Sequence, residues 1–434
     1  MSKLKIGVAR RCTSPEMGTI LYGYPRQRPT QSIHDDLNVI AVAFEYGDTK
    51  AVLLSADLCL TTEQITHKIR QEICDKTGLA YEAVIFSTTH THSGPNANEQ
   101  VSGWGTADYD YVDKILHPQS VQAAIDALNN LRPALMGVGT IQSDVAINRR
   151  VIRDDGKVGL GQNPWGLVDK EMTVVSFKDP ETDEVILNIV HYGCHATASG
   201  ANDEATRDWP GAMKDVIERE LGGTAMFLAG SIGETGPRCP NLDTTQTVQV
   251  AQELGHRAGM DAVNAYRTIK EWRDAPVSIA TGDVVVPYEP LPAKELAEEE
   301  LAKLGKFEDM DVFQKNEYFR WKRVLDEYTD GAPKASWVQK QGILTLGPVA
   351  IVPFPFEMFL YTTLQLRQYS KFPYTLSVSC CNGYYAYLPS EDQLCREGYE
   401  VWQFRNYNTY KMVDSADTYL VTENLKILDE AAKK

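Results

Sequence analysis

Residues 81–95, YEAVIFSTTHTHSGP, contain a short apolar run that leads directly into His90, Thr91 and His92, and then into a Ser-Gly-Pro turn. The run predicts a buried strand, and residues i and i+2 of a strand point to the same side. We therefore expect two imidazoles on one face at the end of this strand, with open space before them. That arrangement suits metal ligands or an acid/base pair. The alternative is two surface histidines that happen to be close, since an alternating pair lacks the specificity of a longer motif.

Composition limits the classes of partner. The chain has 434 residues, 43% of them hydrophobic, and a formal net charge of -16. Such an acidic chain does not favour phosphate backbones or anionic membrane surfaces, so we expect neither a nucleic-acid nor a membrane partner. A small molecule is therefore the expected substrate. Composition does not decide whether the chain forms a homo-oligomer.

The N-terminal segment and the cysteines bear on location. The segment MSKLKIGVARRC has no apolar h-region, and we find no run typical of a membrane span. The 8 cysteines are scattered without a CxxC pair, which favours reduced thiols and a cytoplasmic protein. Cys194 lies beside a candidate ligand. A metal-binding or nucleophilic role is the alternative for it, and a packed core thiol is favoured.

Strand-like and helix-like segments alternate along the first half of the chain, which indicates an α/β fold. A Thr61-x-x-Gln64 capping box and Gly78 predict the ends of a helix over residues 61–77. Helices are also predicted over residues 209–221 and 248–269. The expected strands cover residues 5–9, 38–46, 50–54, 134–141, 171–177, 185–190 and 225–228.

The second half continues the pattern, with one highly charged segment. Strands are expected over residues 277–286, 343–352 and 377–381, a helix just after PFPFEMF, and a last helix over 418–432. Residues 291–330 are helical in pattern, and we expect a solvated helical pair covering the core. No repeat or linker divides the chain, so residues 1–434 are predicted to form one catalytic domain.

Polar side chains gather where predicted strands end. His191 and His195 follow one strand, and Glu357 stands in the apolar stretch VPFPFEMF. A carboxylate in such surroundings needs a compensating cation, although a Glu in the first turn of a helix is the plainer alternative. Two histidines and one glutamate form a familiar zinc set with room for water. Tyrosines follow at positions 384, 385, 387 and 399, where most would be core or rim residues.

Several weak motifs in a fixed order resemble the neutral/alkaline, non-lysosomal ceramidase family. They are SADL at 55–58, THTHSGP at 89–95, AINRR at 146–150, VDKEMTVVSF at 168–177, HATAS at 195–199, PFEMF at 355–359 and NGYYAYLPSEDQLCREGYE at 382–400. The resemblance covers nearly the whole chain. It implies an α/β catalytic domain of stacked mixed β-sheets flanked by helices.

The resemblance also implies site residues. It implies a zinc ion held by His90, His195, Glu357 and Tyr387. His92 matches a second histidine that takes part in catalysis, and Tyr399 matches a tyrosine that helps to hold the substrate carbonyl oxygen. Arg149 matches a substrate-side arginine, and Asp208 matches a position near the site.

Two departures from the family pattern bear on the reaction. Gly236 stands where the family loop has a serine that has been assigned a catalytic role, so a mechanism that needs this hydroxyl is in doubt. The C-terminal immunoglobulin-like domain of ceramidases has no counterpart in this sequence. Both departures argue against ceramide in a bilayer as the substrate.

A zinc-bound water does not need a side-chain nucleophile, because the metal lowers its pKa to roughly 7. His92 is then a candidate proton shuttle, and Tyr399 with the backbone N–H groups from Gly233 to Gly236 is a candidate oxyanion site. We expect a zinc-dependent hydrolase that cleaves an amide in a small polar N-acyl compound. The alternatives are hydrolysis of an ester, lactone or sugar-linked substrate, and a non-catalytic metal-binding receptor.

Overall fold

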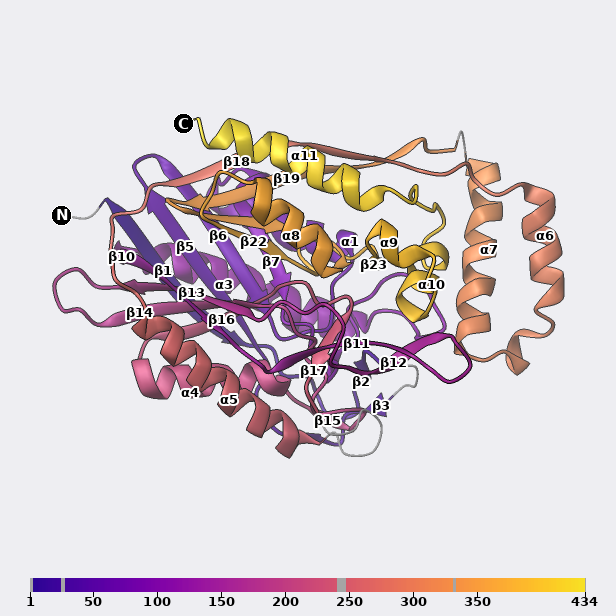
Figure 1. Ribbon diagram of the computed structural model, residues 1–434, viewed down its shortest axis with the longest axis horizontal. Helices are drawn as coiled ribbons and strands as arrows, with labels where there is room; N and C mark the ends of the chain where they lie inside the picture. The colour runs from indigo at the N-terminus through magenta and orange to yellow at the C-terminus, as the bar shows by residue number, and fades with distance from the viewer. Residues whose placement is uncertain (1–2, 25–27, 240–246, 331–332, 434) are drawn as a thin grey trace.

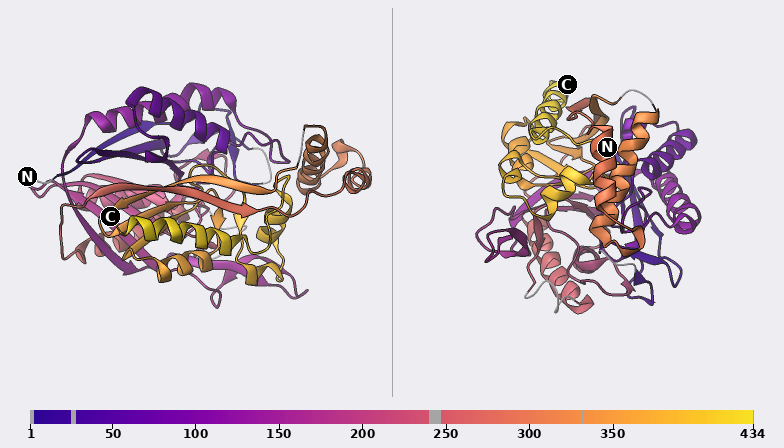
Figure 2. Two further views of the ribbon diagram at one scale, coloured as in Figure 1. Left: turned by 90° about the horizontal axis from the view of Figure 1, so that it is seen from above. Right: turned by 90° about the vertical axis from the view of Figure 1, so that its right-hand side faces the viewer.

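The computed structural model describes residues 3–24, 28–239, 247–330 and 333–433. Figures 1 and 2 show β-sheets stacked on one another, helices on the outer faces, and helices α6 and α7 projecting at one end. The largest core cluster joins the layers, since it contains Phe44, Phe177 and Leu344 from three different sheets. The prediction of an α/β fold with stacked mixed sheets and flanking helices is confirmed.

The first sheet has the strand order β7-β6-β5-β1-β9. It is mainly antiparallel, but β6 and β7 are parallel and are connected through helix α1. Helix α1 buries Ile65, Ile69 and Ile73, whose spacing of four puts them on one face. The bounds are β1 (Leu4–Cys12), β5 (Asn38–Tyr46), β6 (Thr49–Ala56), α1 (Glu63–Thr77), β7 (Val84–Thr88), α3 (His117–Asn129) and β9 (Arg132–Pro133).

Helix α1 ends where the sequence predicts, but it does not begin there. Gly78 ends the helix in the left-handed region, with φ 75°, as its position predicted. The predicted capping box is wrong, because the helix begins at Glu63 and Thr62 is the residue that precedes it. Gln64 is then the second helical residue rather than the third, and the Thr61 hydroxyl lies 2.8 Å from that of Thr66 instead.

Two four-stranded sheets complete the core, in the orders β10-β13-β14-β16 and β18-β19-β20-β22. The single strand predicted over 343–352 is wrong, because Gly347 at φ 52° turns the chain between β19 and β20. The bounds are β10 (Leu135–Gln142), β13 (Glu171–Lys178), β14 (Val185–Tyr192), α4 (Asp208–Leu221), β16 (Thr224–Ala229), α5 (Val248–Arg267), β18 (Val277–Pro287), β19 (Ser336–Leu346), β20 (Val349–Pro353), α8 (Leu360–Tyr369), β22 (Tyr374–Val378) and α11 (Ala416–Ala431).

Short elements at one end of these sheets carry the polar segments. The pairs β11–β17 and β21–β23 matter most, because they place distant segments side by side. The bounds are β2 (Ile20–Tyr22), β3 (Arg28–Pro29), β4 (Ser32–Ile33), β8 (Gly94–Pro95), α2 (Tyr109–Tyr111), β11 (Ala146–Ile152), β12 (Val158–Asn163), β15 (Glu204–Ala205), β17 (Thr235–Pro237), β21 (Glu357–Met358), β23 (Tyr387–Leu388), α9 (Glu391–Leu394) and α10 (Tyr399–Asn406).

The charged segment at 291–330 contains α6 (Lys294–Lys303) and α7 (Val312–Asp330). Most of α6 is exposed, whereas many residues of α7 are half-buried against the rest of the molecule. None of the described helices combines the length and the apolar character that a bilayer-crossing segment requires.

Candidate metal centre

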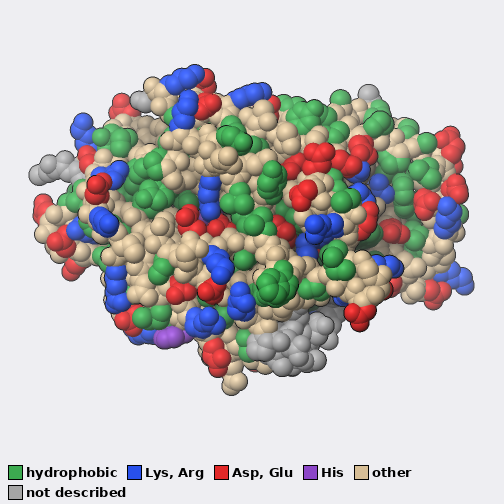
Figure 3. Space-filling view, viewed as in Figure 1, with side chains coloured by type: hydrophobic (Ala, Val, Ile, Leu, Met, Phe, Trp, Pro, Cys, Tyr) green, Lys and Arg blue, Asp and Glu red, His purple; other side chains and the backbone are tan. Residues whose placement is uncertain are grey.

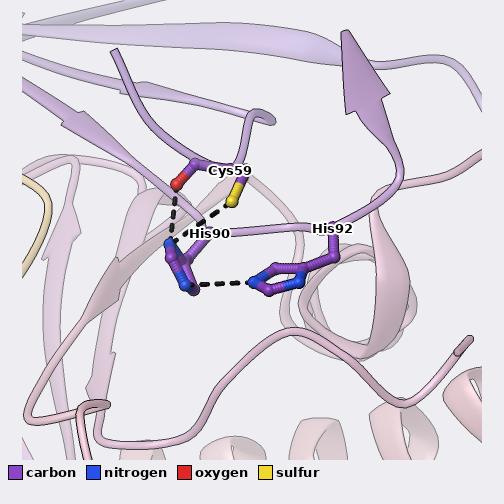
Figure 4. Close-up of side chains that lie close together, drawn as sticks. All are labelled: Cys59, His90 and His92. Atoms are coloured by element: carbon purple, nitrogen blue, oxygen red, sulfur yellow. Dashed lines mark hydrogen bonds between the residues drawn. The ribbon is translucent and has the colours of Figure 1, made fainter. Parts of the chain in front are cut away.

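His90 and His92 lie just past the end of β7, and their side chains meet there, with His90 buried and His92 half-buried. Nε2 of His92 is 3.2 Å from Nε2 of His90 (Figure 4). The predicted reason for this is wrong, because β7 ends at Thr88 and His90 has φ 64°. A left-handed residue breaks the strand alternation, so the turn at His90 brings the rings together rather than a shared strand face.

His195 and Glu357 join His90 from two other parts of the chain. Nε2 of His195 lies 3.1 Å from Nε2 of His90. Oε2 of Glu357 lies 3.0 Å from Nε2 of His195 and 3.4 Å from Nε2 of His90. Donor atoms bound tetrahedrally at about 2.0–2.1 Å from a zinc ion stand about 3.3 Å apart, so the spacing fits a common metal ligand set. We call these three residues the metal centre.

The hydrogen bonds of the two histidine rings assign a proton to each Nδ1 atom. Nδ1 of His90 lies 2.7 Å from the carbonyl oxygen of Cys59, and Nδ1 of His195 lies 2.7 Å from that of Ile232. Each Nδ1 must therefore carry the proton and donate it. Both Nε2 atoms lie within 3.4 Å of Glu357 Oε2, which is buried without a hydrogen-bond partner among the described residues. A buried carboxylate oxygen without such a partner calls for a cation.

The two imidazoles differ in their electrostatics. Burial alone would lower the pKa of His90, but the neighbouring Cys59, Cys380 and Glu357 outweigh it and raise that pKa well above its ordinary value. Burial, together with the Arg149 guanidinium, lowers the pKa of His195 to about 3. Burial alone raises the pKa of Glu357, but the two neighbouring histidines outweigh it and leave that pKa well below its ordinary value. Glu357 is thus ionised and ready to bind a cation.

Tyr387 lies beside Glu357, because β21 and β23 pair in parallel with these two residues opposite each other. Its hydroxyl accepts a hydrogen bond from Nη2 of Arg149 at 3.0 Å. A separate hydroxyl, that of Tyr384, donates to Oε1 of Glu357 at 2.8 Å. The role of Tyr387 as a fourth metal ligand stays a prediction.

Arg149 is held by a carboxylate that the sequence analysis missed. Its Nε donates to Glu400 at 3.0 Å, and its Nη1 lies 3.0 Å from Nε2 of His195. Arg150 donates to the other oxygen of Glu400 at 2.6 Å. The predicted place of Arg149 at the site is therefore matched by its contacts. The feature of the sequence that could have identified Glu400 is its position directly after Tyr399.

A narrow pocket of about 40 Å³ opens onto the metal centre. Burial lowers the pKa of His92, which lines this pocket, well below its ordinary value, so the ring is neutral. Tyr399 also lines it, and its hydroxyl accepts a hydrogen bond from Gln403 at 3.2 Å. The remaining lining residues are Tyr22, Gly23, Cys59, Leu60, His90, Trp104, Glu357, Tyr384, Tyr387, Gln403 and Tyr407.

A family model described as neutral/alkaline non-lysosomal ceramidase, N-terminal, matches residues 4–253, which is more than half of the chain. The chain belongs to the neutral/alkaline non-lysosomal ceramidase family. The matched residues include His90, His92, Arg149 and His195. Glu357 and the tyrosines lie beyond them.

Among curated proteins, this ceramidase-family chain is similar to neutral ceramidase A of Dictyostelium discoideum. The two are 26% identical over 238 residues, which is 52% of this chain and about a third (32%) of the relative. Its fold resembles the solved neutral ceramidase of Pseudomonas aeruginosa with a TM-score of 0.75 at 17% identity, covering 99% of this chain and 75% of that one. A ceramidase complexed with C2 gives a TM-score of 0.76 at 16% identity, with 99% and 76% covered.

Asp208 does not line the pocket of this ceramidase-family chain, but it supports the segment that follows His195. Its Oδ1 accepts from the backbone N–H of Ala198 at 3.0 Å, and its Oδ2 accepts from that of Ser199 at 2.7 Å. Next to it, the indole of Trp209 donates to the carbonyl oxygen of His195 at 2.8 Å. We therefore describe Asp208 as a positioning residue.

The two glycines proposed for substrate binding have different surroundings. The N–H of Gly233 donates to the carbonyl oxygen of Met358 at 2.9 Å, so it is engaged, and the expectation that it holds an oxyanion is wrong. A Cβ at Gly233 would lie 2.6 Å from the carbonyl oxygen of Glu357. Gly236 lies on β17, and a Cβ there would meet only the Arg149 side chain, at 3.7 Å.

Two cysteines lie near the candidate metal centre, whereas Cys194 and His191 lie away from it. Sγ of Cys380 lies 3.4 Å from Nδ1 of His90, and Sγ of Cys59 lies 3.9 Å from it, which the sequence analysis did not predict. Cys194 packs in a core cluster, as favoured. His191 lies away from the metal centre, with its Nε2 2.8 Å from the carbonyl oxygen of Ser377.

Proposed function

We propose that this protein is a zinc-dependent hydrolase that cleaves an amide bond in a small polar N-acyl compound. The observation that carries the proposal is the convergence of three candidate ligand atoms, from His90, His195 and Glu357, at 3.0–3.4 Å from one another. Membership of the ceramidase family supports an amide bond as the target.

The donor set of two imidazoles and one carboxylate suits zinc. A zinc ion held there would polarise a carbonyl group and lower the pKa of a bound water to roughly 7. Tyr387, next to Glu357, is the proposed fourth ligand.

The side chains around the metal centre have separate tasks in this proposal. Neutral His92, whose Nε2 lies 3.2 Å from that of His90, accepts the proton released by the attacking water and passes it to the leaving nitrogen. The Tyr399 hydroxyl donates a hydrogen bond to the substrate carbonyl oxygen. Arg149, held by Glu400, adds a fixed positive charge beside the developing oxyanion.

The size of the pocket supports a small substrate. Its volume is about 40 Å³, and tyrosine hydroxyls, Gln403 and Trp104 line it rather than a long apolar wall. A long acyl chain needs a larger apolar cavity, since ligand sites bury most of the ligand surface. Short acyl groups on a polar amine are therefore the substrates proposed.

One observation favours the alternative bond types. Gly236 faces the Arg149 side chain and has no hydroxyl of its own, so the proposed attack by water does not use a nucleophile from this position. The same arrangement would hydrolyse an ester or a lactone, whose acyl carbon has the same geometry. A substrate panel scored for release of acid, amine, alcohol or sugar distinguishes these reactions.

The decisive measurement is metal content together with turnover. We expect about one zinc per chain in the wild type, and loss of zinc and activity in His90→Ala. His256→Ala, an exposed histidine on α5, is the matched control and should keep both. Full turnover by metal-free wild-type protein would overturn the proposal, and retained zinc without turnover on the panel would favour a receptor.

A further inference from the structure

A second cavity of about 800 Å³ lies apart from the metal centre and is about twenty times larger than the pocket there. Its described lining residues include none that line the pocket at the metal centre. They come from β11, β12, α8, α9 and the beginning of α11, elements that converge on the face turned to the viewer in Figure 1. The volume is in the range of sites that bind small molecules.

The floor of this cavity is built from buried polar side chains in fixed positions. Asn148, Glu234 and Asp417 line it, and each is 5% exposed or less. The Glu234 carboxylate accepts hydrogen bonds from the backbone of Leu360 at 3.1 Å and from Asn148 at 3.2 Å. Asp417 accepts from the backbone N–H of Glu391 at 3.1 Å. Polar groups fixed in this way favour a ligand that forms several hydrogen bonds.

The charge of the lining disfavours anionic ligands. Four carboxylates, at positions 234, 391, 392 and 417, line the cavity, against two arginines. Arg150 is already bound by Glu400 at 2.6 Å and by the carbonyl oxygen of Glu397 at 2.7 Å. Figure 3 shows acidic side chains gathered over α9 and the beginning of α11. An excess of carboxylates repels phosphates and fatty acids.

The rim, in contrast, is apolar and unusually exposed. Ile152 is 70% exposed, Leu167 51% and Tyr361 47%, and all three line the cavity. Trp165, which precedes the lining residue Gly166, is 93% exposed. Large apolar side chains grouped in this way mark an interaction site more often than isolated ones. A ligand for this cavity has an apolar face for the rim and hydroxyl groups for the floor.

We propose that this cavity binds a neutral or amino-substituted sugar of one or two rings. The C–H face of a sugar ring packs on aromatic side chains such as Tyr361 and Trp165. Its hydroxyl groups bond to the carboxylates and amides of the floor, which accept and donate in the plane of each group. The proposal does not depend on the proposed hydrolase activity, because the two sites have separate linings.

The test is a titration of the full chain with D-glucose, N-acetyl-D-glucosamine and D-glucosamine. Binding is measured by calorimetry and by saturation-transfer NMR. Glucose 6-phosphate and octanoate are the anionic comparisons. We expect at least one of the three sugars to bind and the two anions to bind more weakly. Preference for either anion, or no binding by any of the three sugars, overturns the proposal.

Two tyrosines on α8 provide a matched pair of variants. Tyr361 lines the cavity, whereas Tyr369 is 61% exposed on the same helix and does not appear in the lining. We expect Tyr361→Ala to weaken sugar binding at least tenfold and Tyr369→Ala to leave it unchanged. Equal effects of the two substitutions would contradict the proposed site.

His90→Ala distinguishes this proposal from the proposed function. It removes a ligand of the metal centre but no residue of the cavity, so sugar binding should persist in it. Loss of sugar binding in His90→Ala would place the sugar at the metal centre and overturn the inference, whatever the activity of the wild type.

Discussion

Glu400 binds Arg149 and Arg150 at the same time, one with each carboxylate oxygen, at 3.0 Å and 2.6 Å. All three side chains are at least nine-tenths buried. Arg149 thereby directs its two terminal nitrogens toward His195 and Tyr387. The orientation of a charge beside the metal centre therefore depends on a carboxylate that is outside the pocket.

Replacing this carboxylate should weaken both the fold and the reaction. Glu400→Gln removes the negative charge that the two buried guanidinium groups share, and breaking a buried ion pair costs about 3–5 kcal/mol. We expect a lower Tm and at least a tenfold lower kcat, with zinc content unchanged because Glu400 is not a proposed ligand. Thermal unfolding, elemental analysis and steady-state kinetics measure the three quantities.

A neighbouring carboxylate supplies the control for this experiment. Glu397 pairs with Arg405 at 2.7 Å, and its side chain is 64% exposed. An exposed pair contributes at most about 1 kcal/mol, so Glu397→Gln should behave like the wild type. Equal losses in the two variants would show that Glu400 has no special role.

An alanine at position 233 should impair zinc binding, whereas an alanine at position 236 should not. Gly233→Ala places a Cβ 2.6 Å from the carbonyl oxygen of Glu357 and must displace the strand that carries this ligand. Gly236→Ala meets nothing closer than 3.7 Å. We expect at least tenfold weaker zinc binding for Gly233→Ala and wild-type zinc binding for Gly236→Ala, measured by competition with a chelator. Normal zinc affinity in Gly233→Ala would contradict the close packing of Gly233 against Glu357.

Helix α7 is predicted to limit the size of the substrate. Phe313 of α7 packs edge-on against Trp104, which lines the pocket, with ring centroids 6.4 Å apart. The N–H of Gly103 donates to the side chain of Asn316 at 2.7 Å, which fixes the same loop to α7. Phe313→Ala should release Trp104 and raise the ratio of kcat/KM for long acyl groups over that for acetyl.

A second phenylalanine near α7 is the control for this prediction. Phe307 packs against Tyr318 and Phe319, with centroids 5.1 Å and 5.6 Å apart. Phe307→Ala removes a ring of the same size without touching Trp104, so the selectivity ratio should not change. An unchanged ratio in Phe313→Ala as well would rule out a role of α7 in selectivity.

Glu234 predicts a pH-dependent stability. Burial raises its pKa from 4.5 to about 7. The folded state therefore binds the proton more tightly than the unfolded state, and the stabilisation is lost as the pH rises through 7. Between pH 5.5 and 8 we expect the wild type to lose about 2 kcal/mol more than Glu234→Gln, which cannot ionise. Parallel pH profiles of unfolding free energy for the two proteins would contradict this assignment.

The type of each ligand could be predicted from sequence, but its surroundings could not. Glu357 stood out because a carboxylate in an apolar stretch needs a partner, and the structure places it 3% exposed beside two histidines. Glu400 was missed because its partners, Arg149 and Arg150, lie about 250 residues away. The contacts of Cys59 and Cys380 with His90 were missed for the same reason.

Local patterns by themselves determined the helices, most strands and the residue types at the ends of the strands, because backbone preferences and apolar spacing act within a few residues. Only the tertiary structure decided which nitrogen of each ligand histidine carries the proton. That choice follows from hydrogen bonds to the carbonyl oxygens of Cys59 and Ile232, which lie 31 and 37 residues from their histidines. Such bonds exist only once the layers have packed, and they orient two ordinary imidazoles as candidate metal ligands.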